Sequence, residues 1–365
     1  MYVHVNTYKL FDILYIMKRM IKSNELKKIL KRLKTEIGEY KENKEISKRD
    51  FKDYEQKLWK RMHIAIQGFE YYVEKAIKQV QIPIGDSRGR TPILTLKQKT
   101  LLLLLKELIG KSNREMEFLC LVFGCLNGVY VSYKTIERLY SDDEVYYVLM
   151  ELQKILLIKV NIQTTNISVC GDGTGYSLTI SKHYASEAQK LKDKLKELQG
   201  QKKVKSNKKE RKQLFVYHFT LMDIKSRMYV GQGTSKKSEK DAYNKAIKMA
   251  LEFGIQIKDI RLDRYYSGQS TVKSLKEKFG NIQFFLIPKS NATIKGCRNW
   301  KQMLSNFVYN TKEYFTQYYQ RNQSESGFSE DKRRISGKVA QKKIDRISCA
   351  LDLRVIWHNL FWVGA

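Results

Sequence analysis

The chain has 365 residues, which is enough for two or three domains with a substantial hydrophobic core. Its 69 Lys and Arg against 38 Asp and Glu give a net charge of +31, more than solubility requires. This excess indicates a polyanionic partner, and it favours nucleic acid over a membrane surface. No apolar run approaches the roughly 18 residues of a membrane span, and the N-terminus does not read as a signal peptide. We therefore expect a cytoplasmic, nucleoid-associated protein.

Residues 1–90 are expected to form a basic, helical N-terminal region. Apolar residues recur at helical spacing between Leu26 and Ile37 and again between Leu58 and Phe69, among lysines and glutamates. Two interpretations remain open: a helical bundle with solvated charged faces, or an arm that binds the DNA backbone. Turn residues between Gly85 and Pro92 predict the end of this region.

Residues 91–160 are expected to form a second helical domain that contains a helix-turn-helix. A capping box at Ser112 and Glu115 precedes one helix, Asn127-Gly128 predicts a turn, and a short polar helix follows from Ser132 to Leu139. An ordinary αα-hairpin has the same caps and apolar spacing and is the alternative. If the helix at 132–139 is the recognition helix, Tyr133, Lys134 and Glu137 would point outward and Ile136 and Leu139 would be buried. Lys134 and Arg138 would then bind DNA.

The next helix is expected to begin with a capping box formed by Ser141 and Glu144, and to extend to about Ile158. Acidic side chains are favourable in the first turn of a helix because they interact with its dipole. Asp142, Asp143 and Glu144 are therefore interpreted as helix-start acids and not as metal ligands.

Residues 161–350 alternate between strand and helix patterns, and residues 351–365 remain as a C-terminal helix or tail. The order is strand, hairpin, helix, strand, helix, strand and helices, which predicts an α/β fold with a mixed sheet flanked by helices. A basic insertion at 182–213 interrupts this pattern. We expect it to include a mobile loop that binds DNA without reading sequence, through Lys202, Lys203, Lys208 and Lys209.

Two acids are expected at the carboxyl ends of strands, where sites on open sheets usually lie: Asp172 after the strand at 166–171, and Asp263 after the strand at 259–262. Each alone is weak evidence, because an aspartate after a strand is usually a turn or cap residue. Near the C-terminus, Tyr318, Arg321, Glu325 and Lys332 follow one another with gaps of two, three and six residues. On a helix these four side chains share one face.

These motifs resemble those of the DDE-type transposases of prokaryotic insertion sequences. One group of that family carries a Tyr-Arg-Glu-Lys signature with the same three gaps, and the sequences around Asp172 and Asp263 look like its first two acidic motifs. The resemblance covers roughly residues 166–350. It implies a ribonuclease-H-like core, two Mg²⁺ or Mn²⁺ ions, and cleavage at transposon ends followed by strand transfer.

The resemblance also implies roles for individual residues. Asp172, Asp263 and Glu325 would be catalytic metal ligands, while Tyr318, Arg321 and Lys332 would hold the phosphates of the DNA end. The implied partners are double-stranded DNA, as terminal inverted repeats and as target, and a second copy of the chain in a homodimer on DNA. No membrane partner is implied.

The chain departs from the family pattern in two respects. Asp263 and Glu325 are too close in sequence for the β-rich insertion that some relatives carry there, so a tryptophan that receives a flipped base is not assigned, and Trp300 is a weak candidate. Gly327 lies inside the signature helix and is expected to kink it, which affects the position of Lys332.

Two alternatives remain. The first is a ribonuclease-H-like nuclease, such as a junction resolvase, that does not transfer strands. The second is a non-catalytic DNA-binding protein derived from a transposase.

Overall fold

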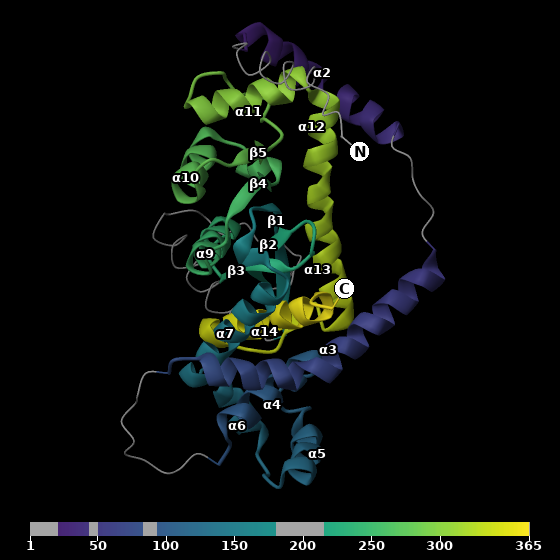
Figure 1. Cartoon of the computed structure of the whole chain (residues 1–365), viewed down its shortest axis with the longest axis vertical. Coiled ribbons are helices and arrows are strands. Elements are labelled where there is room, and N and C mark those ends of the chain that lie inside the picture. Colours follow the sequence, from purple (N-terminus) through teal and green to yellow (C-terminus); the bar gives the residue numbers. More distant parts are fainter. Residues whose placement is uncertain (1–20, 44–49, 83–92, 180–214, 365) are drawn as a thin grey trace, which may run out of the picture.

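The computed structural model describes residues 21–43, 50–82, 93–179 and 215–364. Within these residues the chain forms an α/β structure, a mixed six-stranded sheet flanked by helices (Figure 1), as the sequence predicts. The expected turn at Gly85–Pro92 and the basic insertion at 182–213 lie outside the described residues. The same is true of the four lysines expected to bind DNA there, Lys202, Lys203, Lys208 and Lys209.

The sheet has the strand order β3-β2-β1-β4-β5. Strand β2 is antiparallel to both β3 and β1, while β4 is parallel to β1 and β5 is parallel to β4. A short strand, β6, pairs with the last residues of β1. The bounds are β1 Ile167–Leu178, β2 Phe215–Asp223, β3 Tyr229–Ser235, β4 Ile257–Arg261, β5 Gln283–Phe285 and β6 Lys338–Val339.

Strand β1 is longer than the sequence pattern indicates. The expected end at Asp172 is wrong, because β1 continues to Leu178 and pairs with β2 as far as Ser177. The glycines that follow Asp172 are therefore strand residues and not a turn. A Cβ on Gly173 would lie 2.5 Å from Cδ of Glu239, so this glycine permits close packing of a neighbouring side chain.

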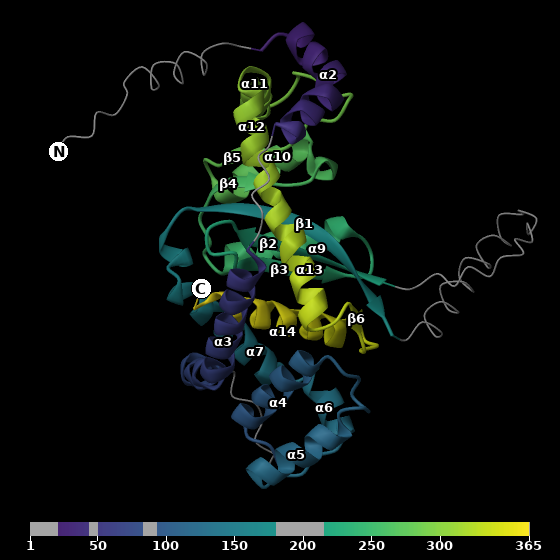
Figure 2. The same cartoon turned by 90° about the vertical axis from the view of Figure 1, so that its right-hand side faces the viewer.

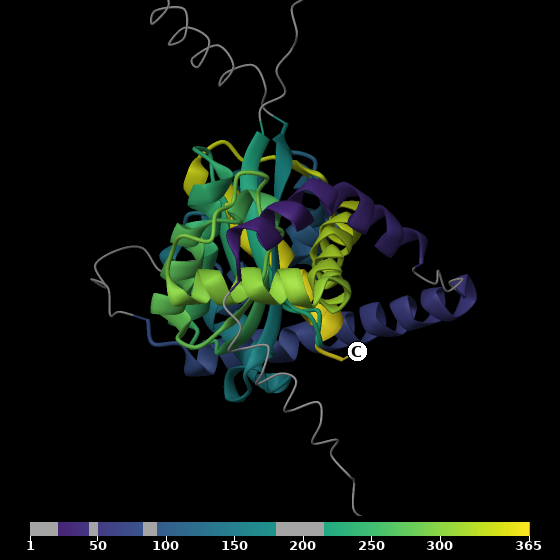
Figure 3. The same ribbon diagram turned by 90° about the horizontal axis from the view of Figure 1, so that it is seen from above.

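The described parts of the N-terminal region, residues 21–43 and 50–82, are mainly helical, as expected, and pack on the rest of the described structure. Helix α2 (Ser23–Glu42) lies beside α11 and α12, where Leu33 joins their apolar cluster (Figures 1 and 2). Helix α3 (Phe51–Gln79) crosses beneath α14, and its N-terminal half extends away from the body (Figures 1 and 3). These helices therefore cover the α/β core.

Four helices follow, α4 (Leu96–Ile109), α5 (Glu117–Asn127), α6 (Tyr133–Leu139) and α7 (Asp143–Lys159). Both hydrogen bonds of the Ser112–Glu115 capping box are present. Helix α5 nevertheless begins only at Glu117, two residues after Glu115.

The expected capping box at Ser141 is wrong, because Asp142 caps α7 by accepting the backbone N–H of Val145. The Ser141 hydroxyl instead donates to Asp345. The interpretation of the acids at 142–144 as helix-start residues is confirmed.

Helix α14 (Ile344–Trp362) lies between the sheet and α3 (Figure 1). The C-terminal segment expected at 351–365 is helical as far as Trp362, but it continues a helix that already begins at Ile344 and is buried along almost its whole length. The Trp357 indole donates to the carbonyl of Leu104, and Phe69 of α3 packs against the same ring. None of the described helices, α14 included, is both long and apolar enough to cross a membrane.

The opposite face of the sheet is covered by α9 (Glu239–Glu252), which lies directly on β3. Helices α10 (Gln269–Phe279) and α11 (Arg298–Tyr309) lie beyond β4 and β5.

Gly233→Ala is expected to lower the free energy of unfolding by about 2–3 kcal/mol. A Cβ at this position of β3 would lie 2.2 Å from the carbonyl oxygen of Ala242 in α9, so strand and helix must separate. Gly38→Ala is the control, because its Cβ meets nothing within 4 Å in the interior of α2 and should stabilise slightly. Chemical denaturation of both variants measures the difference; equal unfolding midpoints would contradict the packing argument.

Candidate active site

Two neighbouring parallel strands bring the first two acids to the same level of the sheet. Cys170 of β1 is paired with Arg261, the last residue of β4. Two residues after each member of this pair come Asp172 and Asp263. Asp172 therefore lies in the middle of β1, not at its end. The expectation for Asp263 is confirmed, since it follows β4 and caps the short 3-10 helix η2 (Arg264–Tyr266), accepting the Arg264 N–H at 2.6 Å.

The four signature residues lie on one rod of three consecutive elements, which Figure 1 shows running along the side of the sheet. Tyr318 ends α12 (Thr311–Tyr318), Arg321 ends the 3-10 turn η3 (Tyr319–Arg321), and Glu325 and Lys332 lie in α13 (Asn322–Arg334). The single helix expected from their spacing thus contains a 3-10 turn.

Gly327 lies inside α13, and the helix continues through it to Arg334. A Cβ there would lie 2.5 Å from Cε of Met222 and 2.8 Å from the Tyr229 hydroxyl. The glycine instead allows α13 to pack closely against β2 and β3.

Arg321 connects two of the three acids. Its Nη2 lies 2.8 Å from Oε1 of Glu325, and its Nη1 lies 3.5 Å from Oδ2 of Asp172. The side chains of Arg321 and Asp172 are 16% and 18% exposed, whereas that of Glu325 is 50% exposed. Asp172 of β1 and Glu325 of α13 also line the same pocket, which lies between these two elements.

Electrostatics link all three acids. Burial raises the pKa of Asp172 to about 6, while Arg321 and the Gly173 N–H oppose the shift, and the negative charges of Glu325 and Asp263 add to it. Burial acts to lower the pKa of Arg321, but Tyr318 and the three acids outweigh it and raise that pKa. Partly buried carboxylates that repel one another are stabilised by a cation between them. In this structure the guanidinium of Arg321 has that position.

The donor atoms are of the kind that a hard divalent cation prefers, since all are carboxylate oxygens. Within the described part of the chain, however, no three Asp, Glu, His or Cys side chains are arranged closely enough to hold a metal ion. The assignment of Asp172, Asp263 and Glu325 as metal ligands therefore stays a prediction.

The other two signature residues differ in their surroundings. Lys332 lines the pocket, and its Nζ donates to Thr174 Oγ1 at 2.6 Å and to the Gly175 carbonyl at 3.0 Å. Burial lowers the pKa of Lys332. The Tyr318 side chain is only 5% exposed and packs in an apolar cluster, and burial raises its pKa to about 12.

Sequence reasoning missed several residues of this pocket. Ser329 and Arg333 lie four and eight positions after Glu325, so they share its helical face, which is the signal that could have identified them. Thr174 lies two positions after Asp172 on the same face of β1. Trp300 is a core residue, 4% exposed, whose indole donates to the Thr293 carbonyl, so it does not suit a base-binding role.

The expected recognition helix, α6, lies away from this pocket (Figure 1). Lys134 and Arg138 are not buried, whereas Ile136 and Leu139 are, as expected. Glu137 forms an ion pair with Arg346 of α14. Since one side of α6 is accessible, the helix-turn-helix and the αα-hairpin both remain possible interpretations.

A comparison with curated proteins found a similar sequence. Over 292 residues the chain is 37% identical to a probable transposase for the insertion sequence element ISA1214 of Archaeoglobus fulgidus. The alignment covers 80% of this chain and 82% of that protein. Searches of protein-family models and of solved structures found no match.

Proposed function

This chain belongs to the transposases of insertion sequence elements, and from that premise we propose that it is a DDE-type enzyme that cuts DNA at transposon ends and joins those ends to target DNA. The observation that carries the proposal is the arrangement of Asp172, Glu325 and Arg321, with Asp263 close enough to affect the pKa of Asp172. The order and directions of β3-β2-β1-β4-β5 support a ribonuclease-H-like core.

DNA is the partner that follows from the family. We propose terminal inverted repeats and target duplex as the two substrates, with two copies of the chain acting together on DNA. The net charge of +31 supports strong phosphate binding.

Asp172, Asp263 and Glu325 would hold two divalent ions, Mg²⁺ or Mn²⁺, through their carboxylate oxygens. When bound, such ions make an attacking water or 3′-hydroxyl more acidic and stabilise the leaving oxygen during in-line displacement at phosphorus. The side chains of the chain itself bind and orient the substrate. Arg321 presents a planar fork suited to phosphate oxygens, and Lys332 provides a second cation on the wall of the pocket that Asp172 and Glu325 line.

The decisive experiment is incubation of the protein with Mg²⁺ and DNA that carries the ends of its own element. Products cut at the ends and joined to a second duplex would support a transposase. Cut products without joined products would favour the nuclease without strand transfer. Binding without either product would favour a non-catalytic DNA-binding protein.

Lys134→Ala is expected to reduce the preference for the element's ends over random duplex by about tenfold, because a base contact by one side chain contributes about 1–3 kcal/mol of discrimination. Lys27→Ala, which removes an exposed lysine from α2, is the control and should leave the preference unchanged. Competition gel shifts measure both. If Lys134→Ala weakens binding to the two DNAs equally, α6 contacts the backbone and does not read sequence.

A further inference from the structure

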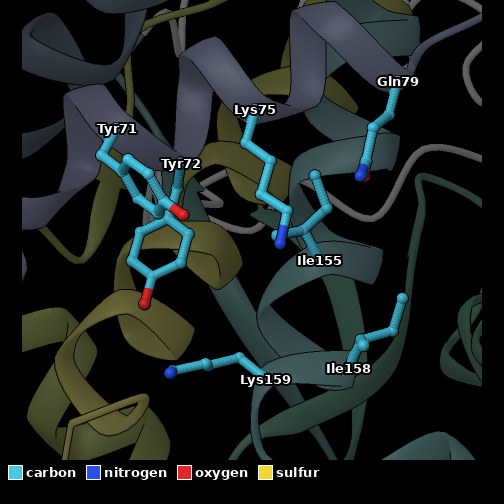
Figure 4. Close-up of a pocket in the computed structure, with 7 residues that line it drawn as sticks. All are labelled: Tyr71, Tyr72, Lys75, Gln79, Ile155, Ile158 and Lys159. Atoms are coloured by element: carbon cyan, nitrogen blue, oxygen red, sulfur yellow. The ribbon is translucent and has the colours of Figure 1, made fainter.

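A second pocket lies between α3 and α7, away from the acids (Figure 4). Its volume is about 400 Å³, which is within the usual range for small-ligand sites. Helix α3 contributes four side chains and α7 contributes three. The lining residues are Tyr71, Tyr72, Lys75, Gln79, Ile155, Ile158 and Lys159.

The pocket carries uncompensated positive charge. Lys75 extends from α3 toward α7, and Lys159 extends toward the tyrosines (Figure 4). No acid lines the pocket, and among the described residues neither lysine has an ion-pair partner. The nearest acids of α3, Glu70 and Glu74, both pair with Lys97 at 2.6 Å. Two cations directed at one space without a counterion provide a site for an anion.

The same pocket has an aromatic and aliphatic wall. The rings of Tyr71 and Tyr72 lie 5.4 Å apart between centroids at an angle of 69°, and Tyr71 is 62% exposed. Buried Ile155 and exposed Ile158 provide apolar surface from α7. Tyr72 is half-buried, and burial raises its pKa, so it is a neutral ring at physiological pH. A ligand that fits must combine a flat apolar part with an anionic part.

We propose that this pocket binds one unpaired nucleotide of a DNA strand, with its phosphate between Lys75 and Lys159 and its base against Tyr71. Aromatic side chains combined with lysines are the means by which proteins bind single strands without reading sequence. A duplex is a convex cylinder with stacked bases, so it cannot place a base in a pocket of this size. DNA is the source of the nucleotide because the chain belongs to the transposases. The inference does not depend on the chemistry proposed for the acids.

The test measures binding of a fluorescent single strand of roughly ten nucleotides, the length of an ordinary single-strand site, to the full chain in EDTA. The double variant Lys75→Gln with Lys159→Gln should weaken binding about tenfold. The slope of log affinity against log salt concentration should become less steep by about 0.7 for each phosphate that the variant no longer neutralises. Tyr71→Ala should weaken binding similarly, and Tyr71→Phe should restore it, because stacking needs the ring and not the hydroxyl. Because EDTA removes divalent ions, this assay measures binding alone. A negative result would therefore count against the nucleotide pocket and not against the proposed cleavage chemistry.

Lys78→Gln with Lys27→Gln is the matched control, as both lysines are helix residues outside the pocket. The proposal is overturned if this control weakens binding as much as the pocket variant does. It is also overturned if the pocket variant weakens duplex binding as much as single-strand binding. A free deoxynucleoside monophosphate that competes as well as the strand would assign the pocket to a free nucleotide and overturn the proposal.

Discussion

Glu325→Gln is expected to abolish DNA cleavage and strand transfer while DNA ends still bind with nearly unchanged affinity. Glutamine keeps the size of the side chain and an oxygen that can accept from Arg321, but it lacks the charge that a divalent ion requires. DNA affinity comes mostly from cations, so the loss of one partly exposed acid should change it little. End binding is measured by gel shift in Ca²⁺, and cleavage is measured in Mg²⁺ on the same preparations.

Glu313→Gln is the control, because Glu313 is an exposed acid of α12, on the same rod but before the signature residues. It should cleave like the wild type. Cleavage at the wild-type rate by Glu325→Gln would remove Glu325 from the active site and, with it, most of the case for a DDE mechanism.

Arg321→Ala is expected to impair both activities, with DNA-end binding about tenfold weaker and cleavage at least about a hundredfold slower. Arg321 contacts both Glu325 and Asp172, so its loss leaves two partly buried carboxylates without their shared cation. It also removes a planar fork placed to bind phosphate. Arg321→Lys keeps the charge without the fork, and we expect an intermediate result.

The same paired assays in Ca²⁺ and Mg²⁺ measure these effects, with Arg298→Ala as the control at an arginine of α11 that lies outside the pocket. End binding at the wild-type level by Arg321→Ala would mean that Arg321 only positions the acids. Thermal unfolding of each variant separates a loss of function from a loss of fold.

The sequence by itself determined the types of most elements, because periodicity and caps are local properties. The predicted order of strand, hairpin, helix, strand, helix and strand agrees with the structure, where these elements are β1, β2 with β3, α9, β4, α10 and β5. The helical spacing also placed Arg321 and Glu325 on one face, and in the structure these two side chains form an ion pair.

Only the tertiary structure decided where these elements end and what they pack against. The sequence predicted that the first strand ends before Asp172, yet β2 pairs with the residues that follow, and so they extend β1. Gly327 read as a kink, yet close packing against Met222 explains it. The sequence predicted a separate C-terminal helix or tail at 351–365, yet residues 351–362 continue α14, which lies in the core because β3 and the helices α3, α4 and α7 bury it. The side chains of Asp172 and Arg321 meet because β1 and the α12–α13 rod pack together, and contacts between residues so distant in the chain have no local signal in one sequence.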